Sequence, residues 1–166
     1  MKDDWEKLPI FIKATEISEL VDHIVKAVEQ TDIDFKDAIQ VEMIKGNLDY
    51  LRENSIIIPA KIAEVANDDT IYDLRMENAA IIRKAARELI TDARGLEMHG
   101  YKDEEYLDLL RTAVNEFRVL FAEWVKTFDP WNYIIDRWGL FNPPGVNYDD
   151  HDPDDDIPLN SDDFLE

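Results

Sequence analysis

The sequence of 166 residues contains no cysteine, only 5 glycines and few basic residues. Without cysteine there is no disulfide framework, no thiolate nucleophile and no cysteine-ligated metal. The 18 Lys and Arg stand against 38 Asp and Glu, which gives a formal net charge of −20. Because phosphate binding needs clustered Lys and Arg, this charge argues against a general affinity for nucleic acid or anionic lipid.

Long hydrophobic runs are also missing. No stretch approaches the roughly 20 apolar residues that a membrane span needs. The first seven residues contain an acidic pair where a signal peptide has a basic region followed by an apolar run. We therefore expect a soluble, cytoplasmic protein without a membrane partner, and its 45% of hydrophobic residues suffice for the core of one domain.

The scarcity of turn-forming residues favours helices. The first 128 residues contain two prolines, Pro9 and Pro59, whereas a β-rich protein of this size needs many more turns. Apolar residues recur at spacings of three, four and seven in four segments, at about 10–28, 35–65, 72–99 and 103–128. With short connections these segments predict an all-α fold, an up-down-up-down four-helix bundle over residues 1–128.

Several local features of the bundle follow from the same pattern. Pro59 removes a backbone donor, so the second helix is expected to kink or break there. Asp69 or Thr70 is the expected N-cap of the third helix, which we expect to run past Gly95 to about His99. The predicted core consists of Ile17, Leu20, Ile24, Leu48, Leu51, Ile62, Ala79, Ala86, Leu89, Leu110, Phe117 and Leu120.

Residues 129–166 form a C-terminal extension of different composition. It holds eleven acids and one base, Arg137, and therefore carries a net charge of −10, half that of the chain. Its acidic run, residues 149–156, predicts disorder, with the boundary of the folded part at 143–145. Its first part is aromatic, and its candidate interaction residues are Trp131, Tyr133, Ile134, Trp138 and Phe141.

The spacing of these aromatic and apolar residues predicts a short helix of about three turns. One side of that helix would present Trp131, Ile134, Ile135, Trp138 and Phe141. This side either folds back and caps an apolar end of its own bundle, or anchors another chain, since clustered Trp and Tyr make efficient interface hot spots.

Signals for catalysis or metal binding are weak. None of the histidines, His23, His99 and His151, belongs to the Glu-x-x-His motif of di-iron bundles. There is no phosphate-binding glycine loop and no nucleophile elbow. The sequence therefore predicts no catalytic, cofactor-binding or metal-binding residue.

Two other functions stay open as alternatives. Glu16-x-x-Glu19 is similar to the first acidic pair of all-α magnesium-dependent hydrolases, and Glu105-x-x-Asp108 is the nearest second pair. The alternative is then a metal-carboxylate hydrolase. The high negative charge also suits an acidic mimic of nucleic acid.

The end of the second helix resembles a known signature. Ile57-Ile58-Pro59-Ala60-Lys61-Ile62-Ala63-Glu64 is similar to the Ser-Ile-Pro-x-Asn-Ile-Ala-Glu-Gly motif of the small proteins encoded in intervening sequences of bacterial large-subunit ribosomal RNA. The accessory variability determinant of diversity-generating retroelements belongs to the same superfamily. The resemblance covers about residues 11–127 and includes three further elements, Glu88-Leu89, Gly100-Tyr101 and Glu116-Phe117-Arg118-Val119-Leu120.

The resemblance implies a four-helix bundle that assembles into a ring-like homopentamer. In its retroelement branch a basic surface holds nucleic acid and a reverse transcriptase. This chain departs from that pattern, because Lys61 and Val65 replace the motif's Asn and Gly, and residues 66–70 form an acidic loop. It resembles a divergent acidic branch that has lost the basic surface.

The sequence thus favours a non-catalytic scaffold or protein-interaction module that binds copies of itself, with an unidentified protein as a further partner. A second apolar edge at Ile56, Ile58 and Val65 is an expected site of self-association. The one cluster of positive charge lies on the third helix, is expected to form salt bridges with acids of neighbouring helices, and is not expected to bind nucleic acid; it consists of Arg83, Lys84, Arg87 and Arg94.

Overall fold

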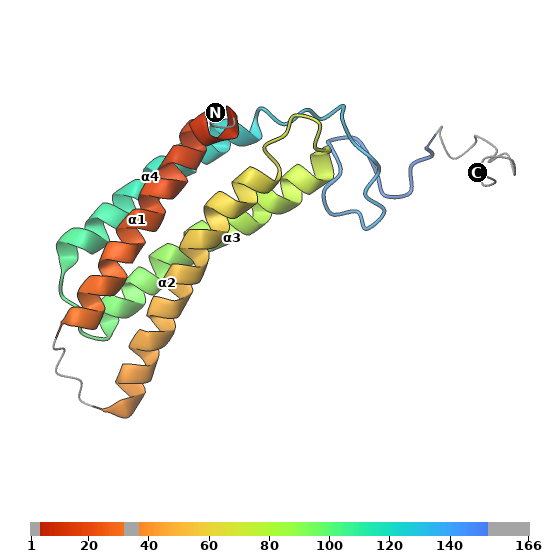
Figure 1. The fold of residues 1–166 in the computed structure, drawn as a ribbon. Helices are drawn as coiled ribbons and strands as arrows, with labels where there is room; N and C mark the ends of the chain where they lie inside the picture. The colour runs from red at the N-terminus through yellow and green to blue at the C-terminus, as the bar shows by residue number, and fades with distance from the viewer. Residues whose placement is uncertain (1–3, 32–36, 153–166) are drawn as a thin grey trace, which may run out of the picture.

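The structure is a computed structural model and describes residues 4–31 and 37–152. A short 3₁₀ helix, η1 (Asp4–Lys7), precedes four α-helices (Figure 1). These are α1 (Pro9–Gln30), α2 (Ala38–Glu64), α3 (Tyr72–Met98) and α4 (Glu104–Val125). The described residues contain no strand, so the predicted all-α four-helix bundle is confirmed.

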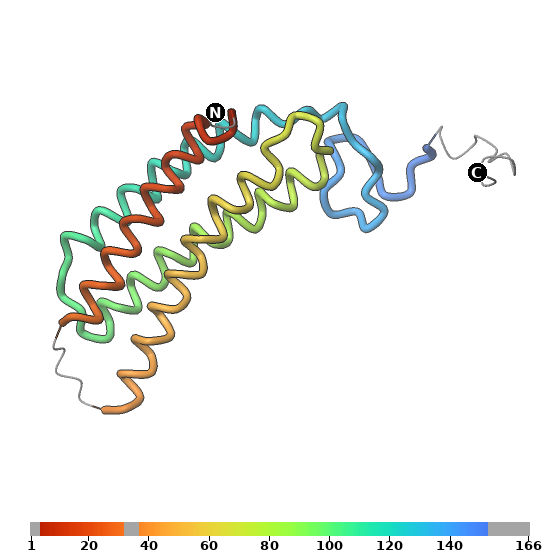
Figure 2. Tube along the Cα trace, viewed as in Figure 1, coloured from red at the N-terminus to blue at the C-terminus, as the bar shows by residue number. Residues whose placement is uncertain are grey.

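The helices form two pairs. α1 packs against α2 and α4, and α2 packs along the length of α3, whereas α3 and α4 touch each other least. The α1–α4 pair and the α2–α3 pair diverge toward the end of the bundle at which the C-terminal extension leaves (Figures 1 and 2). The seam between α3 and α4 therefore stays partly open.

The core follows the predicted stripes. Every residue of the predicted core is buried except Leu20 and Leu120, which are half-buried and pack against it. Phe117 of α4 is 1% exposed and is among the largest fully buried side chains. Burial of these stripes stabilises the bundle by about 1.5–3 kcal/mol for each large apolar side chain.

Helix α2 runs through Pro59 without a break, so the predicted break is wrong. The helix curves along its length (Figure 2). An interior proline costs about 3 kcal/mol, but Ile58 and Ile62 on either side are fully buried. Their burial outweighs the lost hydrogen bond.

The predicted apolar edge around Pro59 is also wrong. Ile58 and Val65 lie in the core, and only Ile56 is exposed. The reason is that α2 contacts both α1 and α3, so two of its faces are covered instead of one. The surface expected for self-association is therefore mostly buried.

The ends of α3 differ partly from the prediction. Its N-cap is Ile71, which offers no side-chain hydrogen bond, so the predicted caps Asp69 and Thr70 are wrong. Its C-terminus is as expected, because the helix continues past Gly95. It ends where Gly100, with φ of 100°, lets the N–H of Tyr101 donate to the carbonyl of Leu96 at 3.0 Å.

Two further points concern the limits of the helices. The predicted start of the second helix at Phe35 lies outside the described residues. Within the described part of the chain, the helices are all too short or too polar to cross a membrane.

Candidate interaction site

The described part of the C-terminal extension, residues 129–152, is called the arm here. Its root is attached to the start of α3. The N–H of Tyr72 donates to the carbonyl of Asn132 at 2.8 Å, and the side-chain amide of Asn132 lies 3.4 Å from the carbonyl of Thr70. The arm thereby satisfies a helix N-terminus that has no side-chain cap of its own.

The middle of the arm is organised by one carboxylate. Asp136 accepts hydrogen bonds from the backbone N–H groups of Trp138, Leu140 and Phe141 at 2.9, 2.9 and 2.8 Å. The side chain of Asn142 accepts from the N–H of Asp136 and donates back to its carbonyl. The N–H donors stabilise the ionised form, which lowers the pKa of Asp136.

A second set of contacts closes the arm into a loop. The guanidinium of Arg137 donates to the carbonyls of Tyr148 at 3.0 Å and Asp150 at 2.8 Å. Gly139, with φ of 72°, lies against the side chain of Tyr148, where a Cβ would come within 3.3 Å. The carboxylate of Asp150 accepts the N–H of Asn147 at 2.8 Å, so Asp150 of the acidic run belongs to the hydrogen-bonded loop. The rest of the acidic run that predicted disorder, 153–156, lies outside the described residues.

The predicted helix in this segment is wrong, because residues 129–152 form turns and irregular loop. The carboxylate of Asp136 bonds to backbone N–H groups that a helix needs for its own ladder.

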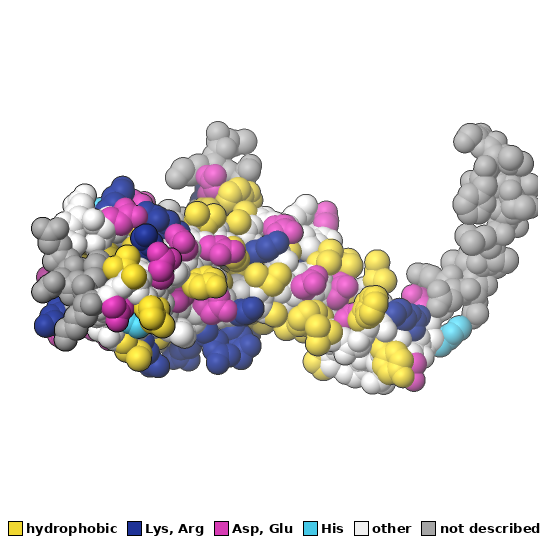
Figure 3. Space-filling model, turned by 90° about the horizontal axis from the view of Figure 1, so that it is seen from below, with side chains coloured by type: hydrophobic (Ala, Val, Ile, Leu, Met, Phe, Trp, Pro, Cys, Tyr) yellow, Lys and Arg dark blue, Asp and Glu magenta, His cyan; other side chains and the backbone are white. Residues whose placement is uncertain are grey.

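The predicted interaction residues do not lie on one side of a helix, and most of their side chains are exposed and so do not form a buried cap on the bundle. Trp131 is 87% exposed and Trp138 96%, Ile134 and Tyr133 are also exposed, and Phe141 is half-buried. The space-filling view shows hydrophobic side chains on the surface of the arm (Figure 3).

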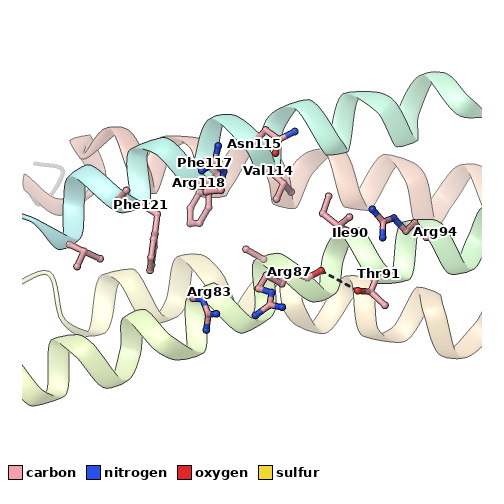
Figure 4. A pocket seen from close by; sticks show the side chains of 13 residues that line it. Arg83, Arg87, Ile90, Thr91, Arg94, Val114, Asn115, Phe117, Arg118 and Phe121 are labelled. Atoms are coloured by element: carbon pink, nitrogen blue, oxygen red, sulfur yellow. Dashed lines mark hydrogen bonds between the residues drawn. The ribbon is translucent and has the colours of Figure 1, made fainter. Parts of the chain in front are cut away.

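A second surface lies between α3 and α4. It is a groove of about 750 Å³ whose floor is apolar (Figure 4). Phe117 and Phe121 point from α4 toward α3, and Ile90 lies on the opposite wall. We call it the α3–α4 groove, and its other lining residues are Arg83, Ala86, Arg87, Thr91, Arg94, Val114, Asn115, Arg118, Ala122 and Val125.

Arginines form the rim of this groove. Arg83, Arg87 and Arg94 come from α3 and Arg118 from α4, and all four are exposed. In the described part of the chain none of them forms an ion pair, so the predicted salt bridges to neighbouring helices are wrong for the three on α3. Lys84 alone of the predicted cluster is paired, with Glu88 of its own helix at 3.8 Å.

The reason is the position of the acids. Among the described residues no Asp or Glu lines the α3–α4 groove, and two acids of α3 have other partners, since Glu97 pairs with Arg111 of α4 and Glu88 accepts a hydrogen bond from Asn54 of α2. Basic side chains are visibly gathered along one edge of the helical body in Figure 3. The groove therefore combines an apolar floor with positive charge in a chain of net charge −20.

The acidic residues considered for metal binding are not assembled into a site. Glu16 lies 2.7 Å from Lys13, whose ammonium also contacts Glu116 of α4 at 2.7 Å. These two carboxylates raise the pKa of Lys13. Across residues 4–31 and 37–152, no group of three or more His, Asp or Glu is placed to hold a metal ion.

Sequence reasoning missed two features, the turns held by Asp136 and the position of Arg118, and only the first had a signal in the sequence. Asp136 is followed by Gly139 and Asn142, a combination typical of turns built on an aspartate side chain. Arg118 lies one helix away from the arginines of α3, so its place beside them depends on tertiary packing. No helical period in the sequence indicates it.

In comparisons with known proteins, no protein-family model, curated protein or solved structure matches this chain. Function therefore has to be inferred from the arm and the α3–α4 groove.

Proposed function

We propose that this protein is a non-catalytic helical scaffold that assembles with copies of itself through its arm. The observation that carries the proposal is the exposure of Trp131 and Trp138, at 87% and 96%, on a loop fixed by hydrogen bonds. Large apolar side chains gathered at one exposed place mark interaction sites in soluble proteins. Tryptophan is also enriched among the residues that dominate binding energy.

The arm is suited to binding because little ordering is left to do. Its turns are already held by Asp136, Asn142 and Arg137. Burial of Trp131 and Trp138 by another chain then costs little additional backbone entropy, and most of the hydrophobic gain remains as binding energy.

The arm and the α3–α4 groove are different surfaces of one chain. Contact between the arm of one copy and another surface of the next is heterologous, and such contacts close into rings or continue as filaments. The resemblance to the intervening-sequence family, which forms ring-like homopentamers, supports a closed ring.

The test compares two pairs of substitutions by multi-angle light scattering. Trp131→Ser with Trp138→Ser removes the exposed arm aromatics, and we expect the dissociation constant for self-association to rise at least about tenfold. Tyr50→Ser with Met98→Ser is the matched control, because both residues are exposed apolar residues on the helices. Equal association of the two variants would contradict the proposal.

The non-catalytic part of the proposal has its own measurement. A metal-carboxylate hydrolase on Glu16 and Glu19 would copurify with stoichiometric divalent metal. Because Lys13 already neutralises Glu16, we expect no stoichiometric metal in the purified protein by elemental analysis. One or two bound ions per chain would favour the hydrolase.

A further inference from the structure

We propose that the α3–α4 groove receives the acidic C-terminal segment, residues 153–166, of a neighbouring copy. This inference rests on the proposed self-assembly. It specifies the two surfaces that make the head-to-tail contact between copies. The groove supplies an apolar floor with four arginines, and the segment supplies apolar residues among acids.

Among the described residues, no acid forms an ion pair with the arginines of the groove. Elsewhere on the bundle many cations are paired, as Arg111 is with Glu97 at 2.6 Å and Arg52 with Glu29 at 2.7 Å. Arg83, Arg87, Arg94 and Arg118 have no such ion pair among the described residues, although the chain has 38 acids. The rim of the groove is thus positive and unneutralised, and it favours an anionic occupant.

The floor requires that the occupant also carries apolar side chains. Phe121 and Ile90 are only half-buried and lie on opposite walls of the groove, at different positions along its length. A purely acidic peptide would leave this surface in contact with water. An acidic segment with interspersed apolar residues covers both the floor and the rim.

The segment 153–166 has this composition. It carries no base, and its acids form two clusters, 154–156 and 162–163, with Glu166 at the end. Ile157 and Leu159 lie between the clusters, and Phe164 and Leu165 follow the second. The segment therefore alternates acids with apolar residues. This pattern complements the groove, in which arginines border an apolar floor.

The lengths are compatible. Arg83 and Arg94 are eleven positions apart on α3, which corresponds to about 16 Å along the helix. Residues 153–166 span up to about 46 Å when extended. One segment can therefore run the length of the groove and still leave residues to connect it to the arm.

The direction of the arm favours a groove on another copy. The arm leaves the bundle beyond the end at which α2 meets α3, and the described chain ends on this arm at Asp152 (Figures 1 and 2). The α3–α4 groove lies back along the bundle. An arm that contacts a neighbouring copy carries the acidic segment to that copy, which gives a head-to-tail contact.

Three full-length variants test the inference by light scattering at about 0.15 M salt. The groove variant carries Arg83→Gln, Arg87→Gln and Arg118→Gln. The control variant carries Lys26→Gln, Lys45→Gln and Arg52→Gln, which remove the same charge away from the groove. The tail variant neutralises the two acidic clusters, and its substitutions are Asp154→Asn, Asp155→Asn, Asp156→Asn, Asp162→Asn and Asp163→Asn.

We expect the groove and tail variants to associate about tenfold more weakly than the wild type and the control. Of these two variants, the tail variant distinguishes better between a specific contact and general charge repulsion. It lowers the net negative charge and so reduces general repulsion between copies, which by itself would strengthen association. Weaker association of the tail variant therefore indicates the loss of a specific contact. Unchanged or stronger association would overturn the inference.

Mixing separates a contact between copies from one within a copy. The groove variant retains its acidic segment and the tail variant retains its arginines, so a mixture restores one contact between two different chains. We expect the mixture to associate more than either variant alone. If mixing has no effect, the segment does not bind the groove of another copy and the inference is overturned.

The same measurements distinguish this inference from the proposed function. Loss of association in the Trp131 and Trp138 variant, with full association in the groove and tail variants, would leave the scaffold proposal standing and overturn the groove contact. A wild type that is monomeric throughout would overturn both.

Discussion

The guanidinium of Arg75 lies over the ring of Phe128, with its central carbon 5.4 Å from the ring centre. Arg75 is 6% exposed and donates hydrogen bonds to the carbonyls of Asn67 and Thr70 in the loop between α2 and α3. Arg75 therefore links three parts of the fold, which are α3, the α2–α3 loop and the chain at Phe128 beyond α4. The same loop also contacts Asn132 at the root of the arm.

We expect Arg75→Ala to lower the free energy of unfolding by about 2–4 kcal/mol, since the substitution removes two part-buried hydrogen bonds of a buried guanidinium and a cation–π contact. Urea unfolding followed by circular dichroism measures this. Arg52→Ala, at an exposed ion pair, is the control and should cost under about 1 kcal/mol. Similar losses for both variants would contradict a structural role of Arg75.

Phe117 is the second position at which stability should respond strongly. Its ring is 1% exposed and lies 6.2 Å from that of Phe121. Phe117→Ala should cost about 3–5 kcal/mol by removing apolar contacts and leaving a cavity. A change under about 1 kcal/mol in chemical denaturation would show that this position is not part of the core.

Asp92 of α3 gives the fold a predictable pH dependence. Burial, with a smaller contribution from the charge of Glu88, raises the pKa of Asp92 to about 6. Between about pH 4 and pH 6, Asp92 therefore holds a proton in the folded state that it has released in the unfolded state. This contribution to stability is fully present below about pH 4 and is lost as the pH rises through about 6.

Asp92→Asn should therefore stabilise the protein at pH 7 by about 2 kcal/mol and leave its stability near pH 4 almost unchanged. Thermal or urea unfolding at the two pH values measures the difference. Asp49→Asn, at an exposed position of α2, is a control of the same chemistry. Destabilisation by Asp92→Asn at pH 7 would contradict the assigned cause of the pKa shift.

The helices could be predicted from the sequence because their stability depends on repeating apolar stripes. The helical spacing of apolar residues predicts one stripe through Ile17 and Ile24 in α1 and another through Leu110 and Phe117 in α4. All four residues are buried. Pro59 shows the limit of local rules, since its cost is local while the compensating burial of Ile58 depends on which helices flank α2.

The candidate site could be predicted only in part. The apolar character of Trp131 and Trp138 indicated an interaction segment, but their periodicity indicated a helix that the side chain of Asp136 prevents. The arginines of α3 were visible as a cluster. Within the described part of the chain, Arg83, Arg87 and Arg94 form no ion pair and lie beside Arg118. This arrangement depends on how far α3 and α4 separate, which no single-helix pattern encodes.

The affinity of the protein for nucleic acid can be tested separately. The groove arginines are few in a chain of net charge −20, so we expect no submicromolar binding of RNA or duplex DNA at physiological salt. Fluorescence anisotropy with labelled RNA and duplex DNA measures this. Submicromolar binding that weakens steeply with salt would contradict this expectation.

The most direct test of the account is the molar mass of the wild-type protein in solution, measured by light scattering at low and moderate salt. We predict a mass that is a multiple of the 19.4 kDa chain. Association should strengthen between about 0.02 and 0.15 M salt, because screening reduces the repulsion between copies of net charge −20. A mass of 19.4 kDa at every concentration and salt would contradict self-assembly.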